Sequence, residues 1–380
     1  MTNQSEKKKR KFNIVPMTVI IAIICIVIAA VIVVYLLTVG KLNWVSFDYS
    51  DDELGISANP LTVEEIIDIN LTDSDDDSIQ SDDTAGSDLQ AGPELSDFVN
   101  IVIFGLSGDS IYDTDRSDTI IICTIDKYNN QLKFTSILRD TKAEIDGYSA
   151  QKINAAYRYG GALLAIKTLN KNFNLSLRDY VTFDFDQVES IVDYVGGVDI
   201  ELSQEEAASL SRDGYYVSAG VNHLDGKTAV KYSRTRSIDS DVYRSERQRK
   251  VIGEIFKKVQ KMSLTEKIAF ITNYIEAVET SLSLTDVIEL AGLPLDEYEV
   301  FNNVVPDTDK DKDIWGGIDA NGEWVWTYDL QYAGKRINNI IYTKQSTKSS
   351  EEASVENISQ TEEVSQAEDI TQTENISQTD

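Results

Sequence analysis

The residues best suited to chemistry form an arginine-rich segment in which five of the chain's twelve arginines fall within sixteen residues: Arg234, Arg236, Arg244, Arg247 and Arg249. A guanidinium group can bind two phosphate oxygens at once, so such a cluster suits a doubly charged or pyrophosphate ligand. Arg244 and Gln248 lie four residues apart and share one face of a predicted helix, next to Arg247. If residues 234–236 are extended, Arg234 and Arg236 project to the same side. On composition alone, an exposed basic face paired with nearby acids explains the segment equally well.

A second pair of candidates lies where two predicted strands begin and end. The segment 116–119 (RSDT) stands directly before one strand, and 136–140 (SILRD) ends the next. Asp118 and Arg139 therefore lie at neighbouring strand ends, where a carboxylate and a guanidinium suit a phosphate and a divalent cation. Taken singly, Asp118 is more typical of a turn or helix cap, and Arg139 of a structural ion pair.

Charge and cysteine content exclude several other kinds of protein. The chain has 64 acidic and 35 basic residues, a formal net charge of −29, which makes duplex nucleic acid an unsuitable partner. One histidine and two cysteines exclude a His-pair metal site and a Cys-rich zinc site. Much of the acidity lies in the flanks, because residues 42–97 hold sixteen acids and residues 349–380 hold nine, with no basic residue in either. The chemistry must therefore use carboxylates, arginines and hydroxyls.

The N-terminal segment predicts a membrane anchor. Residues 17–39 are uncharged and almost wholly apolar, and a helix of that length spans about 35 Å, enough to cross a bilayer. Five basic residues at 7–11 precede this run, so the positive-inside rule places residues 1–16 in the cytoplasm and the rest of the chain outside. A cleaved signal peptide is the competing interpretation, but the apolar run is long for one and no A-x-A site follows it.

The remainder of the chain divides into an acidic extracellular linker (40–97), a globular domain (98–343) and a disordered acidic tail rich in Ser, Thr and Gln (344–380). Within the domain, short β-branched runs alternate with apolar stripes of helical period, which predicts an α/β fold with helices on both faces of a sheet. Strands are predicted at 99–104, 119–124, 131–137, 180–185 and 323–327. Helices are predicted at 155–173, 186–195, 244–262, 270–280, 284–291 and 329–340.

Six motifs together resemble the LytR-CpsA-Psr family, whose order and spacing they match. They are RSDT (116–119), ILRD (137–140), KINAAYRYGG (152–161), VDYVGGVDI (192–200), HLDGKTAVKYSRTR (223–236) and RSERQRKVI (244–252). The resemblance implies a layered α-β-α domain with a central mixed sheet, preceded by one transmembrane helix. It also implies an enzyme of Gram-positive envelopes. Such an enzyme transfers an anionic glycopolymer, of teichoic acid or capsule type, from a polyprenyl-pyrophosphate carrier to a peptidoglycan hydroxyl, assisted by Mg²⁺.

The same resemblance assigns roles to individual side chains. Asp118 belongs to the metal site, and the residues that hold the pyrophosphate are Arg139, Arg234, Arg236, Arg244 and Gln248. Further substrate contacts are expected from Arg116, Arg247, Lys152 and Asn154, although cap and turn roles suffice to explain the last two. The family's first metal-site Asp is replaced here by Ser107, and Asp109 is the candidate to take over its role.

A polyprenyl donor also needs an apolar site for its lipid. We expect a tunnel between the sheet and the helices at 155–173 and 250–260, lined by Leu163, Ile166, Ile255 and Phe256. These residues stand at ordinary core spacing, so plain packing explains any single one of them better.

Two other functions remain open. A lipid-pyrophosphate-binding envelope regulator that has lost its metal chemistry is favoured by Ser107, and it predicts tight binding without Mg²⁺-dependent turnover. A polyprenyl-pyrophosphate hydrolase would use water in place of the sugar hydroxyl, and it predicts release of lipid phosphate without any wall acceptor.

Overall fold

The computed structural model describes residues 49–57, 93–106, 116–274, 278–308, 311 and 313–346. No helix in these ranges combines the length and the apolarity needed to cross a bilayer. The membrane helix predicted at 17–39 lies outside the described residues, and so do the basic N-terminal tail and most of the linker and C-terminal tail. Ser107 and Asp109 also lie outside them.

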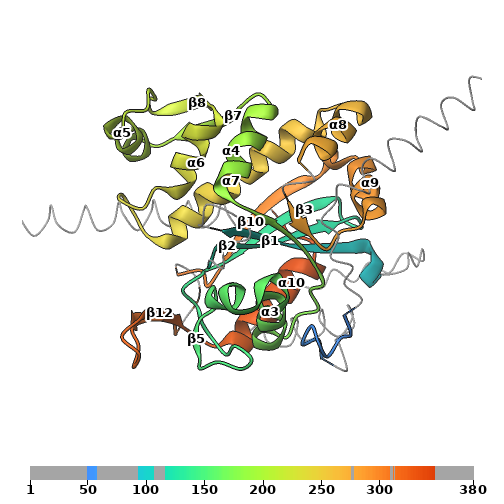
Figure 1. The fold of residues 1–380 in the computed structure, drawn as a ribbon, viewed down its shortest axis with the longest axis vertical. Coiled ribbons are helices and arrows are strands. Elements are labelled where there is room, and N and C mark those ends of the chain that lie inside the picture. Colours follow the sequence, from blue (N-terminus) through green and yellow to red (C-terminus); the bar gives the residue numbers. More distant parts are fainter. Residues whose placement is uncertain are drawn as a thin grey trace, which may run out of the picture.

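A mixed sheet forms the centre of the domain, and six strands of the described residues build it (Figure 1). In spatial order they are β10 (Glu299–Val305), β3 (Gln131–Ile137), β2 (Ser117–Asp126), β1 (Phe98–Leu106), β6 (Asp179–Phe183) and β9 (Glu279–Thr280). Strands β1, β2 and β3 are antiparallel neighbours, while β6 lies parallel to β1 and β10 parallel to β3. Every residue of β3 is buried, as expected of a strand covered on both faces. The expected central mixed sheet is confirmed.

Helices pack on both faces of this sheet, as the alternation of patterns predicts (Figure 1). One face is covered by α3 (Ala155–Phe173) and α10 (Leu330–Tyr342). The other carries α4 (Phe185–Tyr194), α6 (Gly226–Arg234), α7 (Asp241–Gln260), α8 (Leu264–Tyr274) and α9 (Leu284–Gly292). Successive residues of β2 point to opposite layers, so Ile122 belongs to the apolar cluster of α3 and Ile121 to that of α7.

Smaller hairpins of the described residues lie outside the central sheet. They are β4 (Lys142–Ala143) with β5 (Gln151–Lys152), β7 (Val198–Leu202) with β8 (Gly220–Leu224), and β11 (Trp315–Ile318) with β12 (Trp324–Thr327). The helix α5 (Gln204–Arg212) lies between β7 and β8 in the chain, and two short 3-10 helices are η1 (Leu95–Asp97) and η2 (Leu295–Glu297).

Several elements differ from their predictions or, like α5, α6, β7, β8 and β11, were not predicted. The helix predicted at 270–280 ends at Tyr274, because residues 279–280 pair with β6 as the edge strand β9. The strand predicted at 323–327 exists as β12, but it pairs with β11 and not with the central sheet. The sequence does not predict β10, since Asn302 and Asn303 interrupt its apolar pattern and only pairing with β3 makes it a strand.

Lys133 on β3 links α10 to the sheet through hydrogen bonds of its ammonium group. Its side chain is fully buried, and its Nζ donates to Asp126 Oδ2 at 2.7 Å, to the Ile341 carbonyl at 3.0 Å and to the Thr343 carbonyl at 2.8 Å. The ammonium group therefore has an acceptor for each of its three protons and satisfies carbonyls at the end of α10.

Replacing Lys133 by Met should lower the free energy of unfolding by about 3–5 kcal/mol, because the buried carboxylate of Asp126 loses its cationic partner and keeps only the hydrogen bonds from Asn129. Urea unfolding followed by circular dichroism measures the change. Lys250→Met is the control, since Lys250 pairs with Glu246 on the exposed side of α7 and should contribute less than about 1 kcal/mol. Equal losses in the two variants would contradict this role of Lys133.

Candidate functional site

Asp118 and Arg139 meet at one edge of the sheet. Strands β2 and β3 are antiparallel, so the start of β2 lies beside the end of β3. Asp118 is the second residue of β2, and Arg139 follows β3 by two residues. The Arg139 guanidinium donates to the Asp118 carboxylate through Nη1, and the pair is mostly buried. The structure therefore brings together the two strand-end residues that the sequence singles out.

Two further arginines contact the same aspartate, and both come from the side of the sheet that carries α6 and α7. Arg236, in the segment between α6 and α7, donates through Nη2 to Asp118 Oδ2 at 3.1 Å. Arg244, in the first turns of α7, donates through Nη2 to the backbone carbonyl of Asp118 at 3.3 Å. Three guanidinium groups thus surround one aspartate, and we call Asp118, Arg139, Arg236 and Arg244 the arginine cluster.

Asp241 is a member of this neighbourhood that sequence reasoning missed. Its Oδ1 lies 2.5 Å from Arg244 Nη1 and 3.5 Å from Arg139 Nε. Burial raises the pKa of Asp241 above its usual value, although Arg244 and Arg139 both act to lower it. The helix predicted at 244–262 begins at Asp241 in the structure, so Asp241 and Arg244, three residues apart, share one helix face.

Asp140 and Lys152 form an ion pair next to the arginine cluster. Lys152 Nζ lies 2.7 Å from Asp140 Oδ1, and the other carboxylate oxygen of Asp140 lies 3.7 Å from Arg139 Nε. Asn154 stands at the cap position of α3, yet its side chain makes no cap hydrogen bond. Its buried Oδ1 has no hydrogen-bond partner among the described residues. The expected cap role is therefore wrong for this side chain, whose backbone N–H donates to the Arg139 carbonyl at 3.3 Å.

The cluster holds an excess of positive charge in a poorly solvated place. Only 2% of Arg244 is exposed. Burial lowers the pKa of Arg244 to about 10, and the nearby Arg139 and Arg236 act in the same direction while Asp241 opposes them. Burial also acts to lower the pKa of Arg139, but the carboxylates of Asp118, Asp241 and Asp140 outweigh it, so the pKa of Arg139 is raised. Both arginines stay charged at neutral pH, and Arg244 Nε has no hydrogen-bond acceptor among the described residues, while Arg139 Nε faces the carboxylates of Asp241 and Asp140. The unpaired donor of Arg244 suits an anionic ligand.

Arg247 and Arg249 lie apart from the cluster. Arg247 is buried and donates to both carboxylate oxygens of Asp239, at 2.6 and 2.7 Å, and to the Thr235 carbonyl at 2.6 Å. These contacts hold the segment that carries Arg236, so Arg247 is placed to position its neighbour and not to reach a ligand. Arg249 is buried too, and its Nη1 donates to Ser136 Oγ at 2.6 Å.

Arg234 and Arg116 occupy the surroundings of the site. Arg234 is the last residue of α6, so the extended conformation expected for residues 234–236 is wrong at this position. Its guanidinium lies over the ring of Phe185, 4.0 Å from the centroid, as in a cation–π contact. Arg116 Nη2 lies 3.8 Å from Glu323 in the turn of the β11–β12 hairpin.

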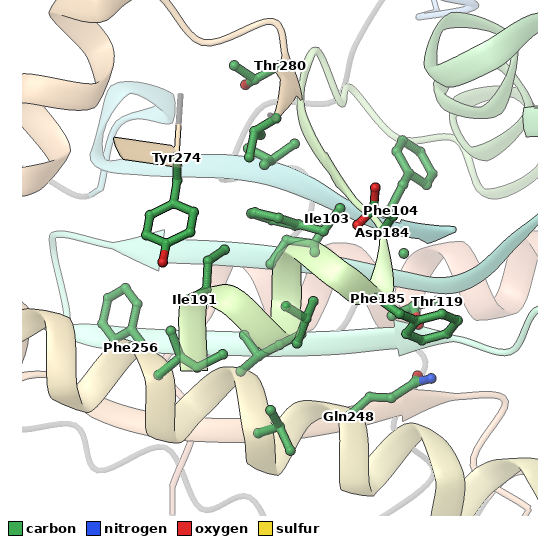
Figure 2. A pocket seen from close by; sticks show the side chains of 18 of the residues that line it. Ile103, Phe104, Thr119, Asp184, Phe185, Ile191, Gln248, Phe256, Tyr274 and Thr280 are labelled. Carbon is green, nitrogen blue, oxygen red and sulfur yellow. The ribbon is translucent and has the colours of Figure 1, made fainter. Parts of the chain in front are cut away.

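An apolar cavity of about 380 Å³ lies beside the arginine cluster, between the sheet and helices α4, α7 and α8 (Figure 2). Figure 2 shows Thr119, Phe185 and Gln248 at one end of this cavity and Phe256 and Tyr274 at the other. Thr119 follows Asp118 in the chain, and Gln248 lies one helical turn after Arg244. The polar end of the cavity therefore adjoins the arginine cluster. The deeper lining includes Ile103, Val181, Val188, Ile191, Val251, Ile252, Ile255, Val259, Phe270 and Ile271.

Only half of the predicted lipid-pocket residues line this cavity. Ile255 and Phe256 do so from α7. Leu163 and Ile166 belong to α3 and pack in the core on the opposite face of the sheet. The expected tunnel between the sheet and both helices is wrong for α3, because the continuous sheet separates α3 from α7, and the cavity lies on the α7 side.

The described residues do not supply a complete metal site. No three His, Cys, Asp or Glu side chains among them converge on a common point. Both carboxylate oxygens of Asp118 already contact guanidinium groups. Mg²⁺ prefers six oxygen ligands, so Asp118 alone does not fit the ion, and Asp109 lies outside the described residues.

Comparison with known proteins identifies the family. A model of the LytR_cpsA_psr family matches residues 66–339, well over half of the chain, and the chain therefore belongs to this family. A polyisoprenyl-teichoic acid–peptidoglycan teichoic acid transferase, TagU of Enterococcus faecalis, is 33% identical over 214 residues, which cover 55% of this chain and 68% of the relative. TagV of Bacillus subtilis, a transferase of the same description, is 32% identical over 203 residues, which cover 51% of each chain.

Solved structures agree with the fold. The LytR-CPS2A-psr family protein YwtF (TagT) with bound octaprenyl pyrophosphate lipid matches with a TM-score of 0.52 and 22% sequence identity. The match covers 67% of this chain and 95% of that structure. At this identity the likeness concerns the fold, and it confirms the layered α/β domain with its central mixed sheet.

The stability of two variants should separate Arg247, which holds its neighbouring segment in place, from Arg236, which is half exposed. Arg247→Ala should lower the free energy of unfolding by about 2–4 kcal/mol, because it removes a buried partner of Asp239. Arg236→Ala should change it by less than about 1 kcal/mol, since half of the Arg236 side chain is exposed. Thermal unfolding of both variants measures the difference, and an equally large loss for Arg236→Ala would show that it too is mainly structural.

Proposed function

We propose that this protein transfers an anionic glycopolymer, of teichoic acid or capsule type, from a polyprenyl-pyrophosphate carrier to a peptidoglycan hydroxyl. The observation that carries the proposal is the apolar cavity with the arginine cluster at its polar end. That arrangement is complementary to an amphiphile with an isoprenoid tail and a pyrophosphate head. The curated relatives are named as teichoic acid transferases, and the structural neighbour carries an octaprenyl pyrophosphate.

The chemistry of the transfer explains the need for arginines. The acceptor oxygen forms a bond to the phosphorus that carries the glycopolymer, and the bond from that phosphorus to the bridging oxygen breaks. The electron pair of the broken bond leaves with the polyprenyl phosphate, and the acceptor hydroxyl loses its proton. Negative charge grows on the leaving oxygen and the equatorial oxygens, and preorganised guanidinium groups stabilise it. Arg139, Arg236 and Arg244 are the residues placed to do so.

The proposal extends to a metal and a location. If Mg²⁺ binds here, Asp118 would hold it together with Asp109, which would take over from the family's first aspartate, and the ion would add positive charge beside the pyrophosphate. The apolar segment 17–39 anchors the protein in a Gram-positive-type cell membrane as a single span, with its N-terminus in the cytoplasm and its domain outside. Peptidoglycan and the lipid-linked polymer are then both within reach.

Arg139→Lys and Arg236→Ala should each lower the transfer rate about 100-fold or more, because each removes a fixed donor from the growing charge. The assay uses the full chain in detergent, a polyprenyl-pyrophosphate-linked saccharide and peptidoglycan fragments, with and without Mg²⁺, and follows sugar phosphate on the acceptor. Arg212→Ala, an exposed arginine at the end of α5, should leave the rate unchanged. Turnover like that of the wild type in both cluster variants would refute their assigned role.

Filling the cavity should block the lipid. Ile255→Trp adds an indole ring to the apolar lining and should weaken binding of octaprenyl pyrophosphate at least tenfold, because the isoprenoid chain loses its space. Leu163→Ala on the opposite face should leave that affinity unchanged while lowering stability. Isothermal titration of octaprenyl pyrophosphate measures both, and unchanged affinity in Ile255→Trp would show that the lipid binds elsewhere.

A regulator that binds lipid pyrophosphate without turning it over is the second candidate. Ser107 at the family's aspartate position and the ion pairs that engage both oxygens of Asp118 favour it. Donor that is bound but unchanged in the transfer assay would establish this function. Lipid phosphate released without labelled acceptor would establish the hydrolase.

A further inference from the structure

The hairpin formed by β11 and β12 presents tryptophans to solvent. It carries three of the chain's four tryptophans, at positions 315, 324 and 326. It projects from the layered domain beside β5 (Figure 1). Trp315 is 51% exposed, Trp324 38% and the neighbouring Ile318 62%. Exposed aromatic area of this size on so short an element exceeds what folding requires and marks a surface for binding.

Trp324 and Trp326 lie on one face of the hairpin with Gly316 and Ile318, whereas Trp315 lies on the other face with Gly317. Trp324 and Trp326 point to the same face, with their ring centroids 4.8 Å apart and their planes at 84°. A Cβ atom on Gly316 would lie 2.7 Å from Trp326 Cζ3, and one on Gly317 would lie 2.3 Å from Trp315 Cζ2. Only glycine therefore leaves the rings room to lie against the strand. Rings fixed in this way lose little freedom when a ligand binds.

The hairpin is joined directly to the arginine cluster. The backbone N–H of Trp326 donates to the Asp140 carbonyl at 2.9 Å, and Thr141 forms a parallel bridge with Trp326. Asp140 is the residue next to Arg139. Lys142 Nζ also lies 3.1 Å from Asp319 in the turn between the two strands. A molecule bound on this hairpin therefore lies next to the proposed phosphoryl-transfer site.

The chemistry of this surface fits a neutral sugar. Indole faces are apolar and electron-rich, so they attract the C–H face of a pyranose ring, while Asn321 and Glu323 in the turn offer hydrogen bonds to hydroxyl and amide groups. Residues 313–327 contain three acids and no base. An anionic polymer or an anionic bilayer is repelled by such a segment. An uncharged carbohydrate is not repelled by these acidic side chains.

We propose that the β11–β12 hairpin binds the sugar rings of the acceptor glycan and directs one hydroxyl toward the arginine cluster. The inference rests on the proposed transfer for its purpose, but the binding of sugar by the hairpin is a separate property. It requires neither the lipid donor nor a metal.

The test uses the full chain in detergent and chitotetraose, a soluble β-1,4-linked N-acetylglucosamine oligosaccharide, with tryptophan fluorescence and isothermal titration as readouts. Trp324→Ala should raise the Kd for this sugar about fivefold to tenfold, and Trp324→Phe should recover most of the loss because it keeps a ring. Trp315→Ala, which removes an exposed indole from the opposite face of the hairpin, should leave the Kd within twofold. Unchanged thermal unfolding establishes that each variant is folded.

Several results would overturn the proposal. They are failure of the wild type to bind chitotetraose, equal affinity in wild type and Trp324→Ala, and binding to phosphatidylglycerol vesicles that Ile318→Ala abolishes. The last result would make the hairpin a membrane contact. Arg139→Lys should bind the sugar as the wild type does. Sugar binding without any transfer would therefore refute the proposed function and leave this inference standing, while transfer with an unchanged acceptor KM in Trp324→Ala would do the reverse.

Discussion

The attraction between Asp118 and three guanidinium groups is the interaction on which the site depends. Arg139, Arg236 and Arg244 come from three separate segments, and their like charges repel one another strongly in a poorly solvated place. Asp118 offsets this repulsion at the centre, with Asp241 and Asp140 beside it. Arg236 remains half exposed, so the cluster still presents a guanidinium group to the surface.

The helix α7 joins the two halves of the site. Its first turns supply Arg244, its next turn supplies Gln248, and the following turns supply Ile252, Ile255 and Phe256 to the cavity. One helix thus passes from a charged end to an apolar end, with the sheet as the opposite wall. A ligand that matches both ends must be amphiphilic, and this is a tighter restriction than either the arginines or the cavity imposes alone.

Much of the fold and part of the site were predictable from the sequence. The period of apolar residues predicts the strands β1, β2, β3 and β6 and the helices α3, α4, α7 and α10, because each has one face that must be buried. The strand ends then predict that Asp118 and Arg139 meet. Helical spacing likewise places Arg244 beside Gln248. The contact of Asp241 with Arg139 and the side-chain surroundings of Asn154 were not predicted, since the partners of a short polar side chain depend on which distant segment packs against it.

The sequence by itself determined the types of residue and their order: an arginine-rich segment, a lone aspartate at a strand start, apolar helices and an uncharged run long enough for a membrane. These are local properties, fixed by side-chain chemistry and by periods of two and 3.6 residues. The tertiary structure alone decided which face of the sheet each helix covers, and so excluded Leu163 and Ile166 from the cavity. It also decided that Arg247 positions its neighbour while Arg236 faces outward, and that a tryptophan hairpin adjoins Arg139. Such choices depend on contacts between segments far apart in the chain, which no local pattern encodes.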